Sequence, residues 1–258
     1  MGRFTKFYII RMEFLGFRYS GWQKQNGVKT VQGMVDKTVK FILKKDDFRT
    51  LAASRTDAKV SALDFVFELL CNAELDSNQL LLDLNKNVPM DIKIKSVTET
   101  SAGFNILHAP KEKEYHYHFT FGQKPNPLVT PFYGYLGKEL NIEAMKEACN
   151  CFLGTHNFRN FVGKPENKTN FTRTIDSINI TNSTRLPAEY LNNRYKLVVK
   201  SKGFMKYQIR LMMGALEQIG RGLLTQNELE KMLNAPEDKS FETVAPGSGL
   251  VLFKTTLA

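Results

Sequence analysis

The sequence predicts an α+β protein built from two units that share one element order, β-α-β-β-α-β. Stretches in which apolar and polar residues alternate indicate strands, and stretches with an apolar residue at every third or fourth position indicate helices. This order of stretches occurs twice, on either side of Leu107–Lys113. The chain has 258 residues, of which 42% are hydrophobic, so each unit can bury a core.

The first unit is expected to span residues 1–107. Thr30 is a suitable N-cap for a helix, and Asp76 or Ser77 for a second one. The expected elements, in order, are a strand at Tyr8–Phe14, a helix with the apolar face Val31, Val35, Val39 and Ile42, a short strand at Phe48–Ala52, a strand at Leu63–Leu69, a leucine-rich helix that ends at Val88-Pro89, and a strand that begins at Ile92.

The second unit is expected to span residues 108–258 and to contain one extra helix. Thr225-x-x-Glu228 has the pattern of a capping box at the start of that extra helix. The expected elements, in order, are a strand at Tyr115–Phe121, a helix from Asn141 that Gly154 closes, strands at Ile175–Ile180 and Tyr195–Val199, a long helix around Ile209–Ile219, the short helix after Thr225, and a strand at Leu250–Leu257. Each unit matches the split-βαβ, ferredoxin-like motif.

The charge of the chain favours a polyanionic partner. The net charge is +10. Residues 1–107 carry 16 basic and 12 acidic side chains, and residues 108–258 carry 20 and 14, so the two parts contribute +4 and +6. Because both units are positive, we expect a positively charged cleft between them, with RNA as the first candidate ligand. A merely soluble basic protein is the alternative.

The cysteines favour a reducing compartment. There are three, Cys71, Cys149 and Cys151, with no C-x-x-C pair, which argues against a disulfide framework. Cys149, Cys151 and His156 lack a fourth ligand, so ordinary core or surface cysteines are favoured over a zinc site. No apolar run approaches the roughly 20 residues that span a bilayer. The start, Met1–Lys6, lacks the apolar segment of a signal peptide.

The stretch Ser54–Ala58, with the sequence Ser-Arg-Thr-Asp-Ala, is the best candidate for chemistry. It is expected to form a loop directly before a strand, where a side chain can be presented to a ligand. A cation near a carboxylate keeps it ionised, and an ionised carboxylate can act as a nucleophile or a base. The alternative is that Asp57 only caps backbone N–H groups in a turn.

Eight blocks in the same order resemble the tRNA pseudouridine synthase A (TruA-type) family. They extend over nearly the whole chain: Phe14–Gln25 with the Y-x-G-W-Q-x-Q pattern, Thr30–Gln32, Arg55–Ala58, Leu84–Ile92, Lys113–Tyr117, Phe152–Phe158, Gly203–Arg210 and Gly249–Leu252. The SRTDA variant and the VAP-x-x-GL ending resemble the animal branch of the family. The resemblance implies the TruA-type fold, with no metal, cofactor or ATP.

The resemblance also implies roles for individual residues. Asp57 is expected to attack the target nucleoside, and Arg210 to pair with Asp57 and hold it charged. Tyr115 is expected to stack on the uracil and to accept the C5 proton, and Arg55 to enter the space of the flipped nucleotide. The expected substrate-binding residues are Leu250, Lys59, Trp22, Gln23, Lys24 and Gln25. For Trp22 and Leu250 a position in the core is the alternative, and for Lys24, Lys37, Lys40 and Lys44 a solvated surface.

Three positions depart from the family pattern. Lys59 stands where the family has a glycine, so a positive φ there would introduce strain of about 1 kcal/mol. Ser61 replaces a histidine and Leu107 replaces an arginine, two side chains that we expect to face RNA. None of these changes removes Asp57, Tyr115 or Arg210.

The leading hypothesis is therefore a homodimeric pseudouridine synthase that acts on tRNA, in the anticodon stem-loop region. A tRNA-binding or tRNA-remodelling protein with impaired catalysis and a general RNA-binding module are the alternatives. The expected compartment is the cytosol, with the mitochondrion as the alternative.

Overall fold

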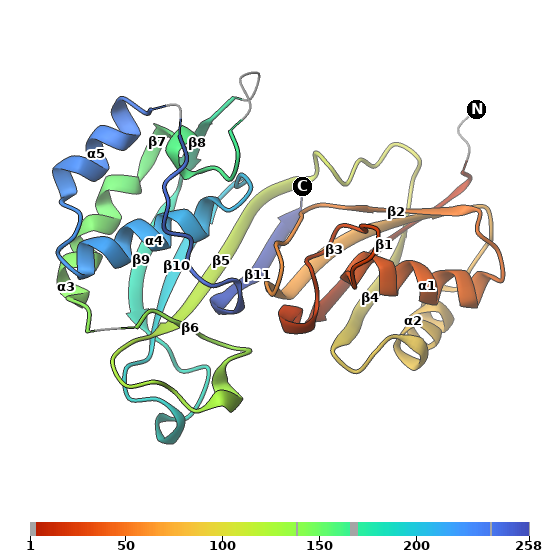
Figure 1. Cartoon of the computed structure of the whole chain (residues 1–258). Coiled ribbons are helices and arrows are strands. Elements are labelled where there is room, and N and C mark those ends of the chain that lie inside the picture. Colours follow the sequence, from red (N-terminus) through yellow and green to blue (C-terminus); the bar gives the residue numbers. More distant parts are fainter. Residues whose placement is uncertain (1–3, 138, 166–169, 238, 258) are drawn as a thin grey trace. The chain divides into compact units, whose positions relative to one another are not determined.

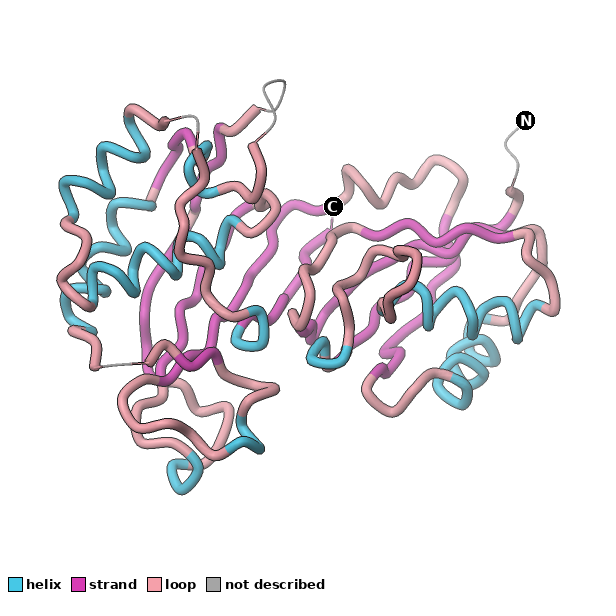
Figure 2. The backbone as a smooth tube through the Cα atoms, in the orientation of Figure 1, coloured by secondary structure: helices cyan, strands magenta, loops and turns pink. Residues whose placement is uncertain are grey.

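The computed structural model describes residues 4–137, 139–165, 170–237 and 239–257, which form an α+β fold as expected (Figures 1 and 2). The start of the chain, where no targeting segment is expected, lies partly outside the described residues. The chain divides into two compact units. Unit 1 comprises Met1–Lys111 and Leu252–Ala258, and unit 2 comprises Glu112–Val251. The division thus falls at residue 111 and not at 107, and the last strand mostly joins unit 1.

Unit 1 contains an antiparallel sheet with the order β4-β1-β3-β2. Its strands are β1 (Lys6–Phe14), β2 (Phe48–Ala52), β3 (Ser61–Cys71) and β4 (Ile92–Thr100). Every second side chain of β1, from Tyr8 to Phe14, is at most 5% exposed. The alternation in the sequence therefore reflects one face of the sheet on the core. The strand order agrees with the expected ferredoxin-like unit.

Two helices, α1 (Val31–Leu43) and α2 (Ser77–Asn87), cover one face of this sheet (Figure 1). Both begin where the sequence predicts. The side chain of Thr30 accepts a hydrogen bond from the Gly33 N–H at 3.2 Å, and the carboxylate of Asp76 accepts one from the Gln79 N–H at 2.7 Å. These caps satisfy backbone donors that would otherwise lack a partner in the first turn.

The last strand, β11 (Leu250–Leu257), lies beside β3. The Thr255 N–H donates to Oδ2 of Asp64 at 3.0 Å, and the Thr255 hydroxyl donates to the Asp64 carbonyl oxygen at 3.0 Å. Arg11 of β1 pairs with Asp64 at 2.7 Å and also donates to the Thr255 carbonyl oxygen at 3.2 Å. This network binds residues 252–257 to unit 1, which is why the unit boundary differs from the expected one.

Unit 2 has a sheet in which β10 (Tyr195–Ser201) pairs antiparallel with both β5 (Pro110–Thr120) and β9 (Ser177–Asn182). Its helices are α3 (Ile142–Ala148), α4 (Gln208–Gly220) and α5 (Gln226–Asn234). Thr225 and Glu228 form the predicted capping box of α5. Within the described ranges, no helix is both long and apolar enough to span a bilayer.

Unit 2 also contains features that the sequence did not predict. The expected helix from Asn141 to Gly154 ends at Ala148 and continues as a 3-10 helix over Cys149–Phe152. A two-residue strand, β6 (Gly134–Tyr135), pairs parallel with β5. Two further short strands, β7 (Gly154–Asn157) and β8 (Thr172–Ile175), form a separate hairpin-like pair. The expected strand at 175–180 is therefore divided at Asp176, whose N–H donates to the Lys200 carbonyl oxygen at 2.9 Å.

Candidate active site

The loop that carries Asp57 joins β2 to β3 and is held by backbone hydrogen bonds to residues 19–22. The Trp22 N–H donates to the Thr56 carbonyl oxygen at 3.1 Å, and the Lys59 N–H donates to the Tyr19 carbonyl oxygen at 3.0 Å. Within the loop, the Val60 N–H donates to the Asp57 carbonyl oxygen at 3.2 Å. The loop backbone is therefore held on both sides of Asp57, whose side chain is partly buried.

Two glycines make the close approach of these segments possible. A Cβ atom on Gly21 would clash with the Thr56 carbonyl oxygen, and one on Gly16 would clash with the Val60 carbonyl oxygen. Gly21 also has a φ of +90°, in the region that favours glycine. The glycines of the first family-like block are thus required for the packing of the Asp57 loop.

The three departures from the family pattern have different places in the structure. Lys59 has a φ of +67°, so the strain expected at this position is confirmed, and its ammonium lies 5.6 Å from the centre of the Phe17 ring. Leu107 is 58% exposed. Ser61 is only 3% exposed, and its hydroxyl accepts a hydrogen bond from the Gly16 N–H at 3.0 Å. At position 61 of this chain the side chain therefore closes the loop internally.

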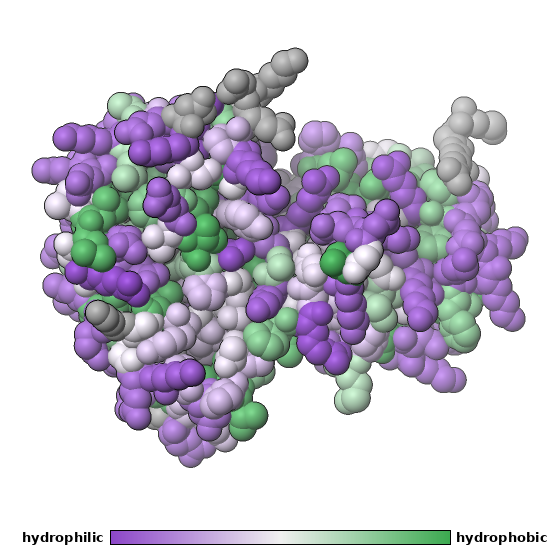
Figure 3. Space-filling model, in the orientation of Figure 1, coloured by the Kyte–Doolittle hydropathy of each residue, from purple (hydrophilic) through white to green (hydrophobic). Residues whose placement is uncertain are grey.

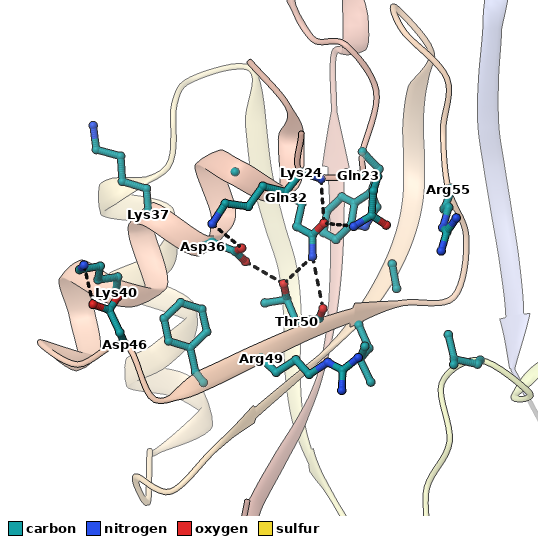
Figure 4. Close-up of a pocket in the computed structure, with 16 residues that line it drawn as sticks. Gln23, Lys24, Gln32, Asp36, Lys37, Lys40, Asp46, Arg49, Thr50 and Arg55 are labelled. Atoms are coloured by element: carbon teal, nitrogen blue, oxygen red, sulfur yellow. Dashed lines mark hydrogen bonds and ion pairs between the residues drawn. The ribbon is translucent and has the colours of Figure 1, made fainter. Parts of the chain in front are cut away.

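A polar pocket of about 640 Å³ lies beside this loop, between α1 and β2 (Figure 4). It is lined by Trp22, Gln23, Lys24 and Arg55 from the expected site and by Leu107. Gln32 of α1 organises its floor: its Oε1 accepts from the Lys24 N–H at 2.9 Å and from Gln23 Nε2 at 3.0 Å. These bonds fix the segment that holds Gln23 and Lys24, whose side chains are exposed together with that of Gln25.

A carboxylate lies in the same pocket. Asp36 of α1 accepts a hydrogen bond from the Thr50 hydroxyl at 2.7 Å, and Lys24 Nζ lies 3.8 Å from the other carboxylate oxygen (Figure 4). Burial raises the pKa of Asp36, while Thr50 and Lys24 act in the opposite direction. The pocket therefore combines exposed cations with two carboxylates, Asp36 and Asp46, each of which is held by its own neighbours.

Trp22 lies in the core. Its indole ring is 1% exposed and packs against Phe65 and Phe67, with ring centroids 4.4 and 5.6 Å away. Its backbone, by contrast, holds the Asp57 loop through Thr56. This placement favours the core alternative for Trp22, which supports the site without exposing its ring.

The site residues expected in unit 2 lie on β5 and α4. Tyr115 of β5 is 7% exposed, and its ring packs edge-on against Phe204 with a centroid distance of 5.3 Å. Arg210 of α4 is partly buried; its Nε donates to the Ala245 carbonyl oxygen at 2.8 Å, and its guanidinium lies 4.9 Å from the centre of the Tyr207 ring. Both side chains are thus held by aromatic neighbours of the segment that precedes α4.

Leu250 begins β11 and is 6% exposed. The turn before it is anchored to β5, because the Tyr117 hydroxyl donates to the Pro246 carbonyl oxygen at 2.9 Å. A Cβ atom on Gly249 would clash with the His118 carbonyl oxygen, so this close approach needs a glycine. Leu250 therefore has a defined position, which fits an apolar wall as well as the core.

Lys113 is a further ionisable residue to which the sequence assigned no role. It lies two residues before Tyr115 on β5, so both side chains point to the same face of the strand. Burial lowers its pKa to about 8. The sequence signal that could have identified Lys113 was its position in the family-like Lys-Glu-Tyr-His-Tyr block.

In the described part of the chain, no three His, Cys, Asp or Glu side chains gather closely enough to hold a metal ion.

Comparisons with known proteins identify the family of the chain. A family model described as tRNA pseudouridine synthase matches residues 148–256. The tRNA pseudouridine synthase A of Aquifex aeolicus is 30% identical over 253 residues, which are 97% of this chain and 99% of that protein. The tRNA pseudouridine synthase A 2 of Clostridium perfringens is 30% identical over 95% of this chain and 97% of its own length. The tRNA pseudouridine synthase A of Acetivibrio thermocellus is 29% identical over 93% of this chain and 95% of its own length.

The α+β chain is thus an enzyme of the isomerase class, a pseudouridine synthase. The chain is a member of the tRNA pseudouridine synthase A family. The relatives named above are bacterial, and the placement in the animal branch stays a prediction. A crystal structure of a Cbf5-Nop10-Gar1 complex aligns over 94% of this chain and 50% of that chain, at 16% identity and a TM-score of 0.34, which is too low to add to the argument.

Proposed function

We propose that this enzyme isomerises uridine to pseudouridine in the anticodon stem-loop region of tRNA, with Asp57 as the catalytic residue. The observation that carries the proposal is the fixed turn around Asp57, which backbone bonds from Trp22 and Lys59 hold on both sides. The positive charge of the chain supports an RNA substrate. The names of the relatives support tRNA as the class of RNA.

The proposed reaction needs no net addition of atoms. Asp57 attacks the target nucleoside, the N-glycosidic bond breaks and the uracil turns. Its C5 then joins the sugar, the bond to Asp57 breaks, the C5 proton leaves, and N1 takes up a proton. We assign the acceptance of this proton to Tyr115 and the charge stabilisation of Asp57 to Arg210. Arg55, which is exposed at the edge of the polar pocket, takes the space of the flipped nucleotide. Leu250 provides an apolar wall.

The direct test measures the release of tritium from tRNA that carries [5-³H]uridine, together with carbodiimide mapping of the modified positions. Asp57→Ala and Asp57→Asn are expected to lose at least about a thousandfold in rate, as enzymes do when a nucleophile is removed. Asp176→Ala, which removes an exposed carboxylate of unit 2, is the control and should keep full activity.

The outcomes separate the hypotheses. Product that maps to the anticodon stem-loop supports the proposal in full, and product elsewhere in tRNA refutes the proposed target region. Absence of pseudouridine with preserved tRNA binding would favour the tRNA-binding alternative, and binding without preference for folded tRNA would favour the general RNA-binding module.

We also propose a homodimer and a cytosolic location, with the mitochondrion as the alternative. The family resemblance supports the dimer, and the three unpaired cysteines support a reducing compartment. Light scattering that gives the mass of one chain would refute the dimer. Imaging of the tagged full-length protein distinguishes the two compartments.

A further inference from the structure

The outer face of α1 carries a row of exposed residues that the proposed chemistry does not use. Lys37, Lys40 and Phe41 stand at positions i, i+3 and i+4, so they lie on one side of the helix, and Lys44 follows directly as its C-cap residue. All four are exposed, whereas Val31, Val35 and Val39 on the other side are buried. The row is therefore the solvent face of a helix whose opposite face holds the core.

Two grooves border this row and share Lys37 and Lys40. The first is the polar pocket of Figure 4, where β2 adds Arg49. The second has a volume of about 740 Å³ and also contains Lys44, Phe41 and, from α2, Lys86. The two grooves together contain seven cations and three carboxylates, which are Lys24, Lys37, Lys40, Lys44, Lys86, Arg49 and Arg55 against Asp36, Asp46 and Asp83.

Few of these cations are neutralised locally. Lys40 pairs with Asp46 at 2.6 Å, and Lys24 lies 3.8 Å from Asp36. Among the described residues, Lys37, Lys44, Lys86 and Arg49 have no ion pair within 4.0 Å. Figure 4 shows Lys37 pointing away from the pocket floor, and Figure 3 shows hydrophilic side chains gathered over this part of unit 1.

Phe41 distinguishes the row from an ordinary charged helix face. Its side chain is 68% exposed in the middle of the lysines and lines the second groove with them. An exposed aromatic ring among cations is the combination that binds nucleic acid, because the ring stacks on a base while the cations contact the backbone phosphates. An acidic protein surface would use the cations but gives the ring no such partner.

We propose that Lys37, Lys40, Phe41, Lys44, Lys86 and Arg49, the α1 track, bind a part of the RNA substrate outside the target nucleotide. The inference rests on the proposed function for the identity of the RNA as tRNA. Arg55 lines the same pocket as Arg49 and lies two residues from Asp57, so the track begins next to the catalytic loop. A whole tRNA is long enough to contact the catalytic loop and the α1 track together, whereas an isolated stem-loop has fewer phosphates available to the track.

The first test measures the affinity for labelled full-length tRNA over a series of KCl concentrations. The triple variant Lys37→Gln, Lys40→Gln and Lys86→Gln is compared with Lys146→Gln, Lys231→Gln and Lys124→Gln, which remove the same charge from exposed lysines of unit 2. Lys146 pairs with Glu143 at 2.8 Å, which matches the pair of Lys40 with Asp46.

The track variant is expected to lose more than about tenfold in affinity at moderate salt, and the slope of log K against log [KCl] should fall by about 3, one for each phosphate contact. The control triple should change affinity less than about threefold. Equal effects of the two triples would overturn the proposal, because they would show only a general effect of net charge. Thermal unfolding checks that both triples remain folded.

The second test concerns the ring. Phe41→Leu is expected to weaken tRNA binding about tenfold, because leucine keeps the apolar bulk but cannot stack, and Phe41→Tyr should retain wild-type affinity. If Phe41→Leu binds tRNA with unchanged affinity, the Phe41 ring does not stack on the RNA. Both tests measure tRNA binding, so their outcome is independent of whether the enzyme forms pseudouridine at the proposed position. Where activity is present, the track triple should raise KM for tRNA more than KM for a stem-loop fragment.

Discussion

Replacement of Glu68 by glutamine is expected to stabilise the protein at neutral and alkaline pH. Glu68 lies on β3 opposite Ile9 of β1 and Leu51 of β2, and it is 3% exposed. The Ile106 N–H donates to its carboxyl group, whereas Oε1 has no hydrogen-bond partner within the described residues. Burial raises the pKa of this group, because its charged form loses hydration.

The direction of the pH dependence follows from this shift. The folded pKa lies above the unfolded value, so the carboxyl group is protonated in both states at low pH and costs little. As the pH rises through the unfolded and then the folded pKa, the unfolded state releases its proton first, and the stability of the folded state falls. The penalty is complete above the folded pKa, which is where the glutamine variant should gain most.

The structure also sets the magnitude. Glutamine keeps an oxygen for the Ile106 N–H and removes only the charge. A buried polar group without a partner costs about 1–3 kcal/mol, and a charged one costs more. The variant retains the cost of a neutral group, so we expect a gain of about 1–2 kcal/mol at pH 8, or about 2–8 °C in Tm for a chain of this size.

The assay is urea unfolding of wild type and Glu68→Gln at pH 8 and at pH 4.5. The difference in the free energy of unfolding should shrink at the lower pH. Glu74→Gln is the control, because the Glu74 side chain is 85% exposed and its pair with Lys6 lies at the surface. A Glu68→Gln variant that is less stable than wild type at pH 8, or a difference that does not change with pH, would refute this account of the buried carboxyl group.

Two further stability predictions concern the backbone and a helix cap. Lys59→Gly should raise the free energy of unfolding by about 0.5–1 kcal/mol, because relief of strain at φ +67° outweighs the greater freedom of glycine in the unfolded chain; Lys59→Ala retains the strain, so an equal gain for alanine in urea unfolding would contradict the explanation. Thr225→Ala should cost about 1 kcal/mol, because it removes the hydroxyl that accepts from the Glu228 N–H at 3.3 Å; hydrogen exchange should show faster opening of α5, and unchanged exchange there would contradict a role for this cap.

The elements of unit 1 could be predicted from the sequence because their signals are local. The alternation in β1 and the caps at Thr30 and Asp76 involve residues close together in the chain, and each had its expected partner in the structure. The capping box of α5 was equally local. Such signals depend on the geometry of a single strand or helix turn, so no knowledge of the surrounding fold was needed.

The missed elements of unit 2 depend on contacts between distant residues. Gly134–Tyr135 forms a strand only because it pairs with Phe119 and Thr120, and two residues show no periodicity. The strands β7 and β8 are four residues each and likewise exist through their mutual pairing. The membership of β11 in unit 1 also depends on distant contacts, because the hydrogen bonds between Thr255 and Asp64 join residues 191 positions apart.

The same limit applies to the site. Ser61 stands where the family pattern has a histidine, and only the folded structure shows its hydroxyl accepting from the Gly16 N–H. Burial of the Trp22 ring and the lowered pKa of Lys113 also arise from neighbours that the sequence does not identify. Motifs therefore predicted which residues are candidates for the site, whereas the burial of each side chain could be determined only from the folded structure.

The departures at Lys59 and Leu107 should affect substrate contacts more than the position of Asp57, whereas Ser61 is buried inside the loop. The bonds that hold the Asp57 loop run from the backbone N–H groups of Trp22 and Lys59 to backbone carbonyl oxygens, so they do not depend on which side chain occupies position 59. Ser61 adds an internal bond, and Leu107 changes the lining of the pocket next to Arg55. A family-type residue restored at position 107 should therefore alter KM for tRNA with little effect on kcat, and a dominant effect on kcat would show that this pocket also sets the geometry of the chemical step.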